Sequence, residues 1–256
     1  MEQIEIGIML PGAIKFNDDN VNPTWKAHIQ THKEAVVGFV KLVEFRKVYV
    51  ECVCAVIGRE LGLPIPKPIL VKVPHESLPD EVPKSSFTIG FASQDAEYPS
   101  FRRYFNSNSQ EAINSLINFS KALDISVFDE WIGNWDRNIG NILFDGKDEY
   151  YFIDHENAID RKLNSDAPAS RNQILEQLAS SLSEFEKYKS NRISQTNITP
   201  TYEGLPFSLV SEKTLGGLYL SDDEVVSVIQ FLEERLSSLK ELVNDRWGFQ
   251  QQELSL

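Results

Sequence analysis

Residues 128–157, FDEWIGNWDRNIGNILFDGKDEYYFIDHEN, contain three polar side chains that decide how the chain is interpreted. Asn141 lies five positions after Asp136, and Asp154 lies eighteen positions after it. Phosphoryl transfer from Mg-ATP requires one carboxylate that orients the attacking hydroxyl and two oxygen ligands that hold the metal against the phosphates. Carboxylate and amide oxygens are ligands that Mg2+ prefers. Asp-x4-Asn, followed by an aspartate after a strand, therefore indicates a phosphoryl-transfer site.

The segment between Asn141 and Asp154 predicts a β-hairpin. Asn141 precedes the apolar residues 142–144, polar residues 145–148 indicate a turn, and the apolar run 150–153 ends at Asp154. In such a hairpin both ligands fall near the same end, so one metal ion could contact both. Taken singly, Asp136, Asn141 and Asp154 could each be a surface residue or a helix cap. As a set they favour the functional interpretation.

Upstream of this motif, Lys41 and Glu51 form a second candidate pair. Lys41 lies near the end of the apolar, β-branched run Ala35–Val43, which predicts a buried strand. Glu51 follows ten residues later in the predicted helix Tyr49–Leu61. Alone, Lys41 would be interpreted as a solvated charge at a strand edge. A carboxylate in the next helix could pair with it and hold it toward ATP phosphates, although Glu44 and Glu60 are competing partners.

A glycine-rich phosphate loop is missing from the sequence. Neither G-x-G-x-x-G nor G-x-x-x-x-G-K-[ST] occurs, so P-loop and Rossmann nucleotide sites have no support in the sequence. If a segment covers the phosphates, we expect it to be Lys26–Gly38. His28 and His32 stand four apart within it, but without the glutamate of a zinc protease they are expected to be solvated loop residues.

Composition restricts the classes of partner. The 256 residues carry a net charge of −13, and no basic cluster is visible, which argues against nucleic-acid and anionic-membrane surfaces. The acidic start MEQIEIGIML does not resemble a signal peptide, and no apolar run approaches the roughly 20 residues of a membrane helix. Cys52 and Cys54 are expected to be buried thiols in a reducing compartment, so we expect a cytoplasmic protein.

The order of predicted elements indicates an α+β fold. Strands are expected at Ile4–Leu10, Ile69–Val73 and Ser86–Ala92, in addition to Ala35–Val43. Helices are expected at Gln110–Leu123, Ile125–Gly133 and Asn172–Lys189, with a last helix capped by Ser221. Residues 160–172 and 190–208 are expected to be irregular. We predict a β-rich N-lobe over residues 1–93 and a mainly helical C-lobe over residues 94–256, meeting near residues 92–100.

The chain resembles the protein-kinase-like fold, and within it the HipA-like kinases. The resemblance is carried by residues 128–141, which are similar to the I-G-N-x-D-R-x-x-x-N catalytic loop of that family, and by the helix–proline junction ELGLPIPKPILVKV at 60–73. It covers about residues 35–158. Family members include serine/threonine kinases that act as toxins in toxin–antitoxin modules, which implies a protein substrate and an antitoxin or other regulatory partner.

The resemblance also implies a role for each site residue. Asp136 would be the catalytic base, and Asn141 and Asp154 would be the Mg2+ ligands. Lys41 would anchor the ATP phosphates, with Glu51 as its ion-pair partner. Backbone groups around 89–92, including Ile89 and Phe91, would meet the adenine at the connection between the lobes.

Two further interpretations remain open. Asp154 is followed by His-Glu rather than the Phe-Gly of ordinary protein kinases, and this ending is similar to aminoglycoside and choline phosphotransferases. Those enzymes usually carry His-Gly before the catalytic aspartate, where this chain has Asn134-Trp135. A small-molecule or lipid kinase is therefore the first alternative. A nucleotide-binding pseudokinase that acts as a regulator is the second, because the glycine-rich loop is missing.

Overall fold

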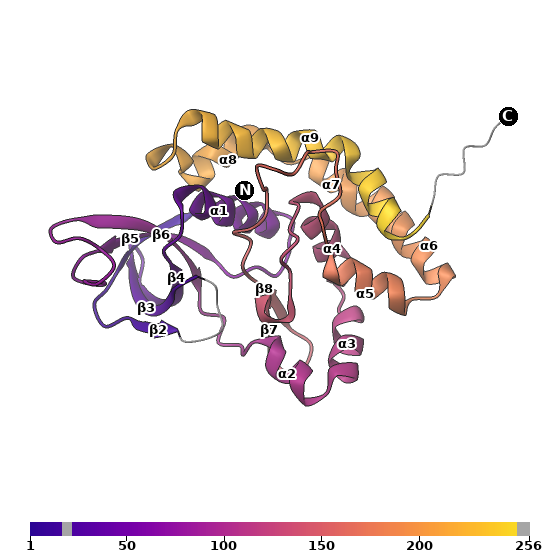
Figure 1. Ribbon diagram of the computed structural model, residues 1–256, viewed down its shortest axis with the longest axis horizontal. Helices are drawn as coiled ribbons and strands as arrows, with labels where there is room; N and C mark the ends of the chain where they lie inside the picture. Colours follow the sequence, from indigo (N-terminus) through magenta and orange to yellow (C-terminus); the bar gives the residue numbers. More distant parts are fainter. Residues whose placement is uncertain (17–21, 250–256) are drawn as a thin grey trace.

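The computed structural model describes residues 1–16 and 22–249, and its first part is a six-stranded sheet (Figure 1). The strands are β1 (Glu5–Met9), β2 (Ile14–Phe16), β3 (Thr24–Thr31), β4 (Ala35–Lys41), β5 (Pro68–Pro74) and β6 (Phe87–Gln94). They lie in the order β1-β5-β6-β4-β3-β2, and β1 also pairs with β3. This extra pairing curls the sheet upon itself. Only β1 and β5 run parallel among these described pairs.

Alternating side chains fill the inside of the curled sheet. In β3, Trp25, Ala27 and Ile29 are buried while the residues between them are exposed, as expected of a strand with one face on a core. They join an apolar cluster that includes Val40 of β4 and Val71 of β5. The strand pairing β3–β4 runs from Thr24↔Lys41 to Gln30↔Ala35, which fixes Lys41 at the end of β4.

Helix α1 (Phe45–Glu60) lies between this sheet and the rest of the protein. Val48, Cys52 and Val56 lie one turn apart and pack against β5 and β6, while Tyr49 and Val53 belong to the main hydrophobic core. The helix is therefore apolar on nearly all sides, as expected of a buried helix. Glu51, in its middle, is 1% exposed.

The second part of the described chain is mainly helical. The helices are α2 (Phe101–Ser107), α3 (Ser109–Ile117), α4 (Ala122–Trp131), α5 (Gln173–Ser181), α6 (Glu184–Ile193), α7 (Thr199–Glu203), α8 (Phe207–Thr214) and α9 (Asp222–Arg246). A short hairpin, β7 (Ile142–Phe144) with β8 (Tyr150–Phe152), follows α4. Figure 1 shows α9 running along one side of the molecule, over α1 and α4. Buried Trp131 of α4 donates a hydrogen bond to the carbonyl of Leu232 in α9 at 3.0 Å.

The predicted α+β class is confirmed, with a β-rich part followed by a helical part, and Ser221 caps α9 as expected by accepting from the Glu224 amide. Three local predictions for the helical part are wrong. Segment 110–123 is not one helix, because α3 ends at Ile117 and α4 begins at Ala122. The helix expected over 172–189 is split at Ser183, whose capping box with Glu186 starts α6.

The third error is the loop expected over 190–208. The end of α6, a π-helical turn at Ser194–Ile198 and α7 occupy most of it. Ile198 and Tyr202 are buried in the main core, so tertiary packing supplies the stability that the polar sequence does not indicate.

The segment Lys26–Gly38, expected to cover the phosphates if any segment does, forms most of the β3–β4 hairpin. His28 accordingly lies on a strand rather than in a loop, and its side chain is exposed. The connection between β2 and β3 includes residues 17–21, which lie outside the described residues.

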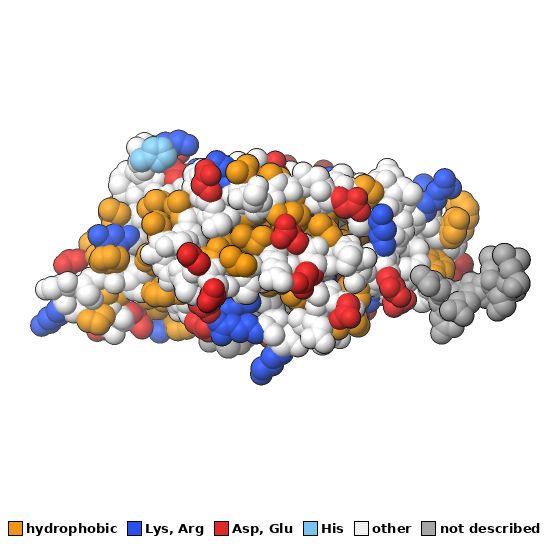
Figure 2. Space-filling view, turned by 90° about the horizontal axis from the view of Figure 1, so that it is seen from above, with side chains coloured by type: hydrophobic (Ala, Val, Ile, Leu, Met, Phe, Trp, Pro, Cys, Tyr) orange, Lys and Arg blue, Asp and Glu red, His pale blue; other side chains and the backbone are white. Residues whose placement is uncertain are grey.

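The described helices include none long and apolar enough to cross a membrane. On the face that carries α8 and α9, apolar side chains gather between acidic ones (Figure 2). Leu218 and Val226 are among the exposed apolar residues.

Candidate active site

The β7–β8 hairpin brings Asn141 and Asp154 to the same end, as predicted. Ile142 pairs with Phe152, and the Ile153 amide donates to the Asn141 carbonyl at 3.0 Å. Asn141 immediately precedes β7 and Asp154 follows β8 by two residues. Asp154 has a φ of +66°, in the left-handed region, where a side chain other than glycine costs about 1–2 kcal/mol. Such a turn redirects the chain and points the carboxylate toward the site.

Buried Arg137 holds this end of the hairpin in place. Its guanidinium donates to both carboxylate oxygens of Asp129 in α4, at 2.9 and 3.0 Å. It also donates to the carbonyls of Asn141 at 3.1 Å and Ile153 at 2.6 Å. A rigid planar donor of this kind fixes several partners at once. Arg137 therefore sets the backbone beside both predicted metal ligands.

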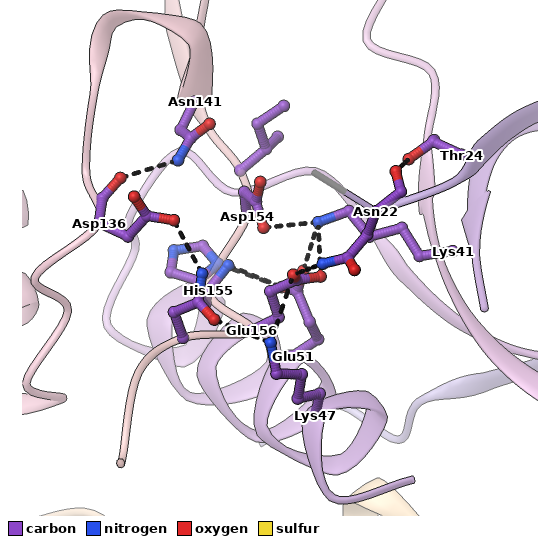
Figure 3. A network of polar contacts seen from close by, with 12 residues as sticks. Asn22, Thr24, Lys41, Lys47, Glu51, Asp136, Asn141, Asp154, His155 and Glu156 are labelled. Carbon is purple, nitrogen blue, oxygen red and sulfur yellow. Dashed lines mark hydrogen bonds and ion pairs between the residues drawn. The ribbon is translucent and has the colours of Figure 1, made fainter. Parts of the chain in front are cut away.

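Asp136 lies in a tight loop whose backbone is held by amide side chains. The Asp136 carbonyl accepts from Nδ2 of Asn138 and from Nδ2 of Asn141, both at 3.0 Å. Because the amide nitrogen of Asn141 is directed into the loop, its amide oxygen faces the other way, toward the side of Asp154 (Figure 3). The Asp136 carboxylate accepts through Oδ2 from Nδ2 of Asn157 at 2.8 Å.

Lys41 connects the sheet, helix α1 and the segment after the hairpin (Figure 3). Its ammonium lies 2.9 Å from Glu51, 2.6 Å from Asp154 and 3.4 Å from Glu156. The expected pair of Lys41 with Glu51 is present, whereas Glu44 and Glu60 do not contact the lysine in the described structure. The other oxygen of Glu51 accepts from the backbone amide of His155 at 3.0 Å.

The charges of this cluster support each other. Burial alone would lower the pKa of Lys41, but Glu51, Asp154 and Glu156 together raise that pKa above its ordinary value of 10.5. Burial would raise the pKa of Glu51, yet Lys41 and His155 hold it below its ordinary value. Lys41 and Glu51 are therefore both charged near neutral pH.

Glu156 is the member of the cluster whose charged form is least favourable. Burial raises its pKa, and the neighbouring charges of Asp154 and Glu51 add to that increase against the opposing attraction of Lys41. One oxygen of Glu156 accepts from the side chain of Asn22, and Lys47 of α1 lies 3.8 Å away. Asn22 lies two residues before β3, so this contact joins the sheet to the segment after Asp154.

Two sets of residues could hold a cation. Oxygen atoms of Glu51, Asp154 and Glu156 all lie within 4.8 Å of one another. Lys41 contacts all three residues, so their shared cation is the lysine ammonium. The predicted Mg2+ ligands, Asn141 and Asp154, supply an amide oxygen and a carboxylate, the donor types that suit Mg2+.

Ile89 and Phe91, the expected adenine contacts, lie in strand β6. Phe91 is paired there with both Lys41 and Leu70, and Ile89 and Phe91 pack on the apolar cluster beside α1. Strand β6 continues to Gln94, and residues 95–99 connect it to the residues before α2. The connection thus falls within residues 92–100, where the two parts were expected to meet, while residues 89–92 belong to the sheet; contact of Ile89 and Phe91 with adenine stays a prediction.

Four residues that contact the site were not predicted from the sequence: Lys47, Glu156, Asn157 and Asn22. Two signals were present in the sequence. Glu156 and Asn157 directly follow the motif aspartate, and Lys47 precedes Glu51 by four residues, so both face the same side of α1. No local pattern indicates Asn22, whose contact with Glu156 spans 134 positions.

The chain matches the sequence pattern of the HipA-like kinase family over residues 35–196, more than half of its length. It belongs to that family. The crystal structure of a Helicobacter pylori proinflammatory kinase, CtkA, is similar over 98% of both chains, with a TM-score of 0.54 and 14% sequence identity. At that identity the likeness concerns the fold, which is that of a kinase. No curated protein sequence matches the chain. Family and fold together support a phosphotransferase.

Proposed function

We propose that this HipA-like kinase transfers the γ-phosphoryl group of Mg-ATP to a serine or threonine hydroxyl of a protein. The observation that carries the proposal is Lys41, which contacts Glu51 of α1 and Asp154 of the catalytic segment at once. This contact joins the expected phosphate anchor to an expected metal ligand. The choice of a protein hydroxyl rests on the similarity of the 128–141 loop to HipA-like kinases.

Each side chain has a defined task in this proposal. Lys41 binds phosphate oxygens, and Glu51 keeps its ammonium directed away from the sheet. Asn141 and Asp154 would hold Mg2+, which when bound neutralises charge on the phosphates. Asp136 orients the acceptor hydroxyl and receives its proton. Its carboxylate is not paired with Lys41 and can therefore act as a base.

The test is transfer of labelled γ-phosphate with magnesium, using the purified protein alone, a cell lysate, and a panel of aminoglycosides and choline as acceptors. We expect labelling of the protein itself or of a lysate protein, and loss of that signal in Asp136→Ala and Asp154→Ala. Transfer to a small alcohol without protein labelling would support the alternative suggested by the Ile153-Asp154-His155-Glu156 ending. Nucleotide binding without any transfer would identify a pseudokinase and contradict the proposal.

A further inference from the structure

A second set of contacts connects α1 to the catalytic loop, separately from the Lys41–Glu51 pair. Lys47, one turn before Glu51 on α1, donates to Oδ1 of Asn157 at 2.9 Å. Nδ2 of the same Asn157 donates to Oδ2 of Asp136 at 2.8 Å. The three side chains form a continuous chain from the first turn of α1 to the proposed base. Figure 3 shows Lys47 and Asp136 on opposite sides of the segment that carries Glu156.

The chemistry of the two end groups determines how Asn157 is oriented. An ammonium group only donates hydrogen bonds and a carboxylate only accepts them, whereas a primary amide has one end of each kind. Lys47 therefore requires the amide oxygen, and Asp136 requires the amide nitrogen. If the Asn157 amide were flipped, its nitrogen would face the ammonium of Lys47 and its oxygen would face the carboxylate of Asp136, and neither contact would be a hydrogen bond. Lys47 thus fixes the end of Asn157 that reaches Asp136.

We infer that Asn157 is a positioning residue for Asp136 and that Lys47 orients it. The bond to Oδ2 stops rotation of the carboxylate and leaves Oδ1 for the acceptor hydroxyl. A hydrogen bond from a neutral donor to a carboxylate is among the stronger ones in proteins. This inference rests on the proposed function, in which Asp136 is the base.

The arrangement couples α1 to both halves of the site. Glu51 and Lys47 lie four residues apart and therefore on one face of the helix. Through Lys41, Glu51 acts on Asp154, while Lys47 acts through Asn157 on Asp136. A shift of α1 would release the base as well as the phosphate anchor.

Kinetics of variants test the inference. Asn157→Ala should lower kcat about 10- to 100-fold, the value of one hydrogen bond to a charged group, with KM for ATP within twofold of wild type because Lys41 and Glu51 are untouched. Asn157→Asp keeps the shape but places an acceptor against Asp136, so it should be no more active than Asn157→Ala. Lys47→Met should lower kcat less, and Lys47→Arg should restore it.

Matched controls come from remote sites. Asn191→Ala removes an amide that donates to Asn244 at 2.9 Å, and Lys121→Met removes a lysine 3.3 Å from Asp124; both should leave kcat unchanged. Wild-type kcat in Asn157→Ala, or an equal loss of kcat, ATP affinity and melting temperature, would overturn the inference.

Crystal structures of wild type and Asn157→Ala decide the matter independently of activity. We expect the Asp136 carboxylate to rotate or become disordered in the variant. An unchanged, ordered carboxylate would overturn the positioning role even if no phosphate acceptor had been found. Absence of transfer by the wild type, by contrast, would count against the proposed function and not against this geometry.

Discussion

Two buried polar networks in this protein differ in how completely their charges are matched. One surrounds Lys41, where Glu51, Asp154 and Glu156 share a single ammonium with help from Lys47 at the edge. The other surrounds Glu130 of α4, which pairs with Arg246 at 3.0 Å and lies 3.6 Å from Arg235, while Glu176 of α5 lies 3.7 Å from Arg246.

Most polar atoms of the Glu130 network form hydrogen bonds within the chain, although Nη2 of Arg235 makes none among the described residues. Arg235 donates to the Glu130 carbonyl and to the carbonyls of Asn164, Ser165 and Ala167. The Ala169 amide and the Asn172 side chain donate to the two oxygens of the Glu130 carboxylate. This network attaches the irregular segment 164–169 to α4 and α9.

The Lys41 network retains an excess of negative charge, and Asp136 lies beside it. Buried charges without full compensation are costly, so proteins keep them where a ligand completes the balance. The comparison supports the proposal that the first network serves binding and transfer, and it indicates that the second serves stability. Variants in the two networks should therefore affect different measurements.

The largest effect is expected from Asp136→Asn. The substitution keeps the shape of the side chain but removes the proton acceptor, so kcat should fall by about 10²- to 10⁴-fold. The free energy of unfolding, followed by urea denaturation, should change by less than about 0.5 kcal/mol because the side chain is only half-buried. A large loss of stability would remove the distinction between the two networks.

Arg235→Met is expected to have the opposite profile. Arg235 is fully buried, and its removal leaves three loop carbonyls without their donor. The free energy of unfolding should fall by about 3–5 kcal/mol, the usual cost of breaking a buried charged network. At temperatures where the variant remains folded, KM for ATP should stay near the wild-type value. Stability equal to wild type would contradict the structural role.

Lys41→Met should affect both measurements. It removes the phosphate anchor, and it also leaves the carboxylates of Glu51 and Glu156 buried without their cation. We expect the affinity for ATP, measured by calorimetry, to fall at least about tenfold. Stability at pH 7 should fall by about 3 kcal/mol.

The pH dependence of that stability loss has a definite sign. In the wild type the pKa of Glu51 is held below 4.5, so its contribution to stability is fully present above that pH and is lost as pH falls further. In Lys41→Met the attraction of the lysine is gone, so burial raises the pKa of Glu51 against the remaining contacts with His155, and burial together with the neighbouring carboxylates raises the pKa of Glu156. The variant should take up protons and recover stability relative to wild type between pH 7 and pH 5. A pH-independent difference in urea unfolding would contradict this account.

The smallest effect is expected from Glu156→Gln. Because burial raises the pKa of Glu156, the folded protein binds its proton more readily than the unfolded chain, and the charged form opposes folding at neutral pH. The variant should be more stable by no more than about 1 kcal/mol at pH 7, and the gain should shrink as pH falls. Destabilisation at pH 7 would show that the contacts with Asn22 and Lys47 outweigh the cost of burial.

The sequence predicted the site best where its residues are close together in the chain. Asn141 and Asp154 meet because a short hairpin with apolar strands and a Gly146 turn can pair in only one register. Lys41 and Glu51 were within reach because a strand end and the helix after it are neighbours. Asn22 and Lys47 act on residues more than 100 positions away, and only tertiary structure reveals such contacts.

Fold prediction failed where neighbouring structure overrides local preference. Residues 194–203 are polar and contain Pro200, yet they are helical because Ile198 and Tyr202 fill the core between α4 and α9. In β3, Trp25, Ala27 and Ile29 alternate with polar residues as in a strand, whereas His28 was expected in a loop. Strand Ala35–Lys41 and helix α1, both rich in apolar residues, were found to within a few positions.

The most direct test of the division between binding and transfer is a single-turnover experiment with labelled Mg-ATP bound to wild type and to Asp136→Asn. We predict that both proteins bind the nucleotide with similar Kd and that only the wild type transfers the labelled phosphate at an appreciable rate. Transfer by Asp136→Asn at the wild-type rate would contradict the account, because the carboxylate held by Asn157 would then have no part in the reaction.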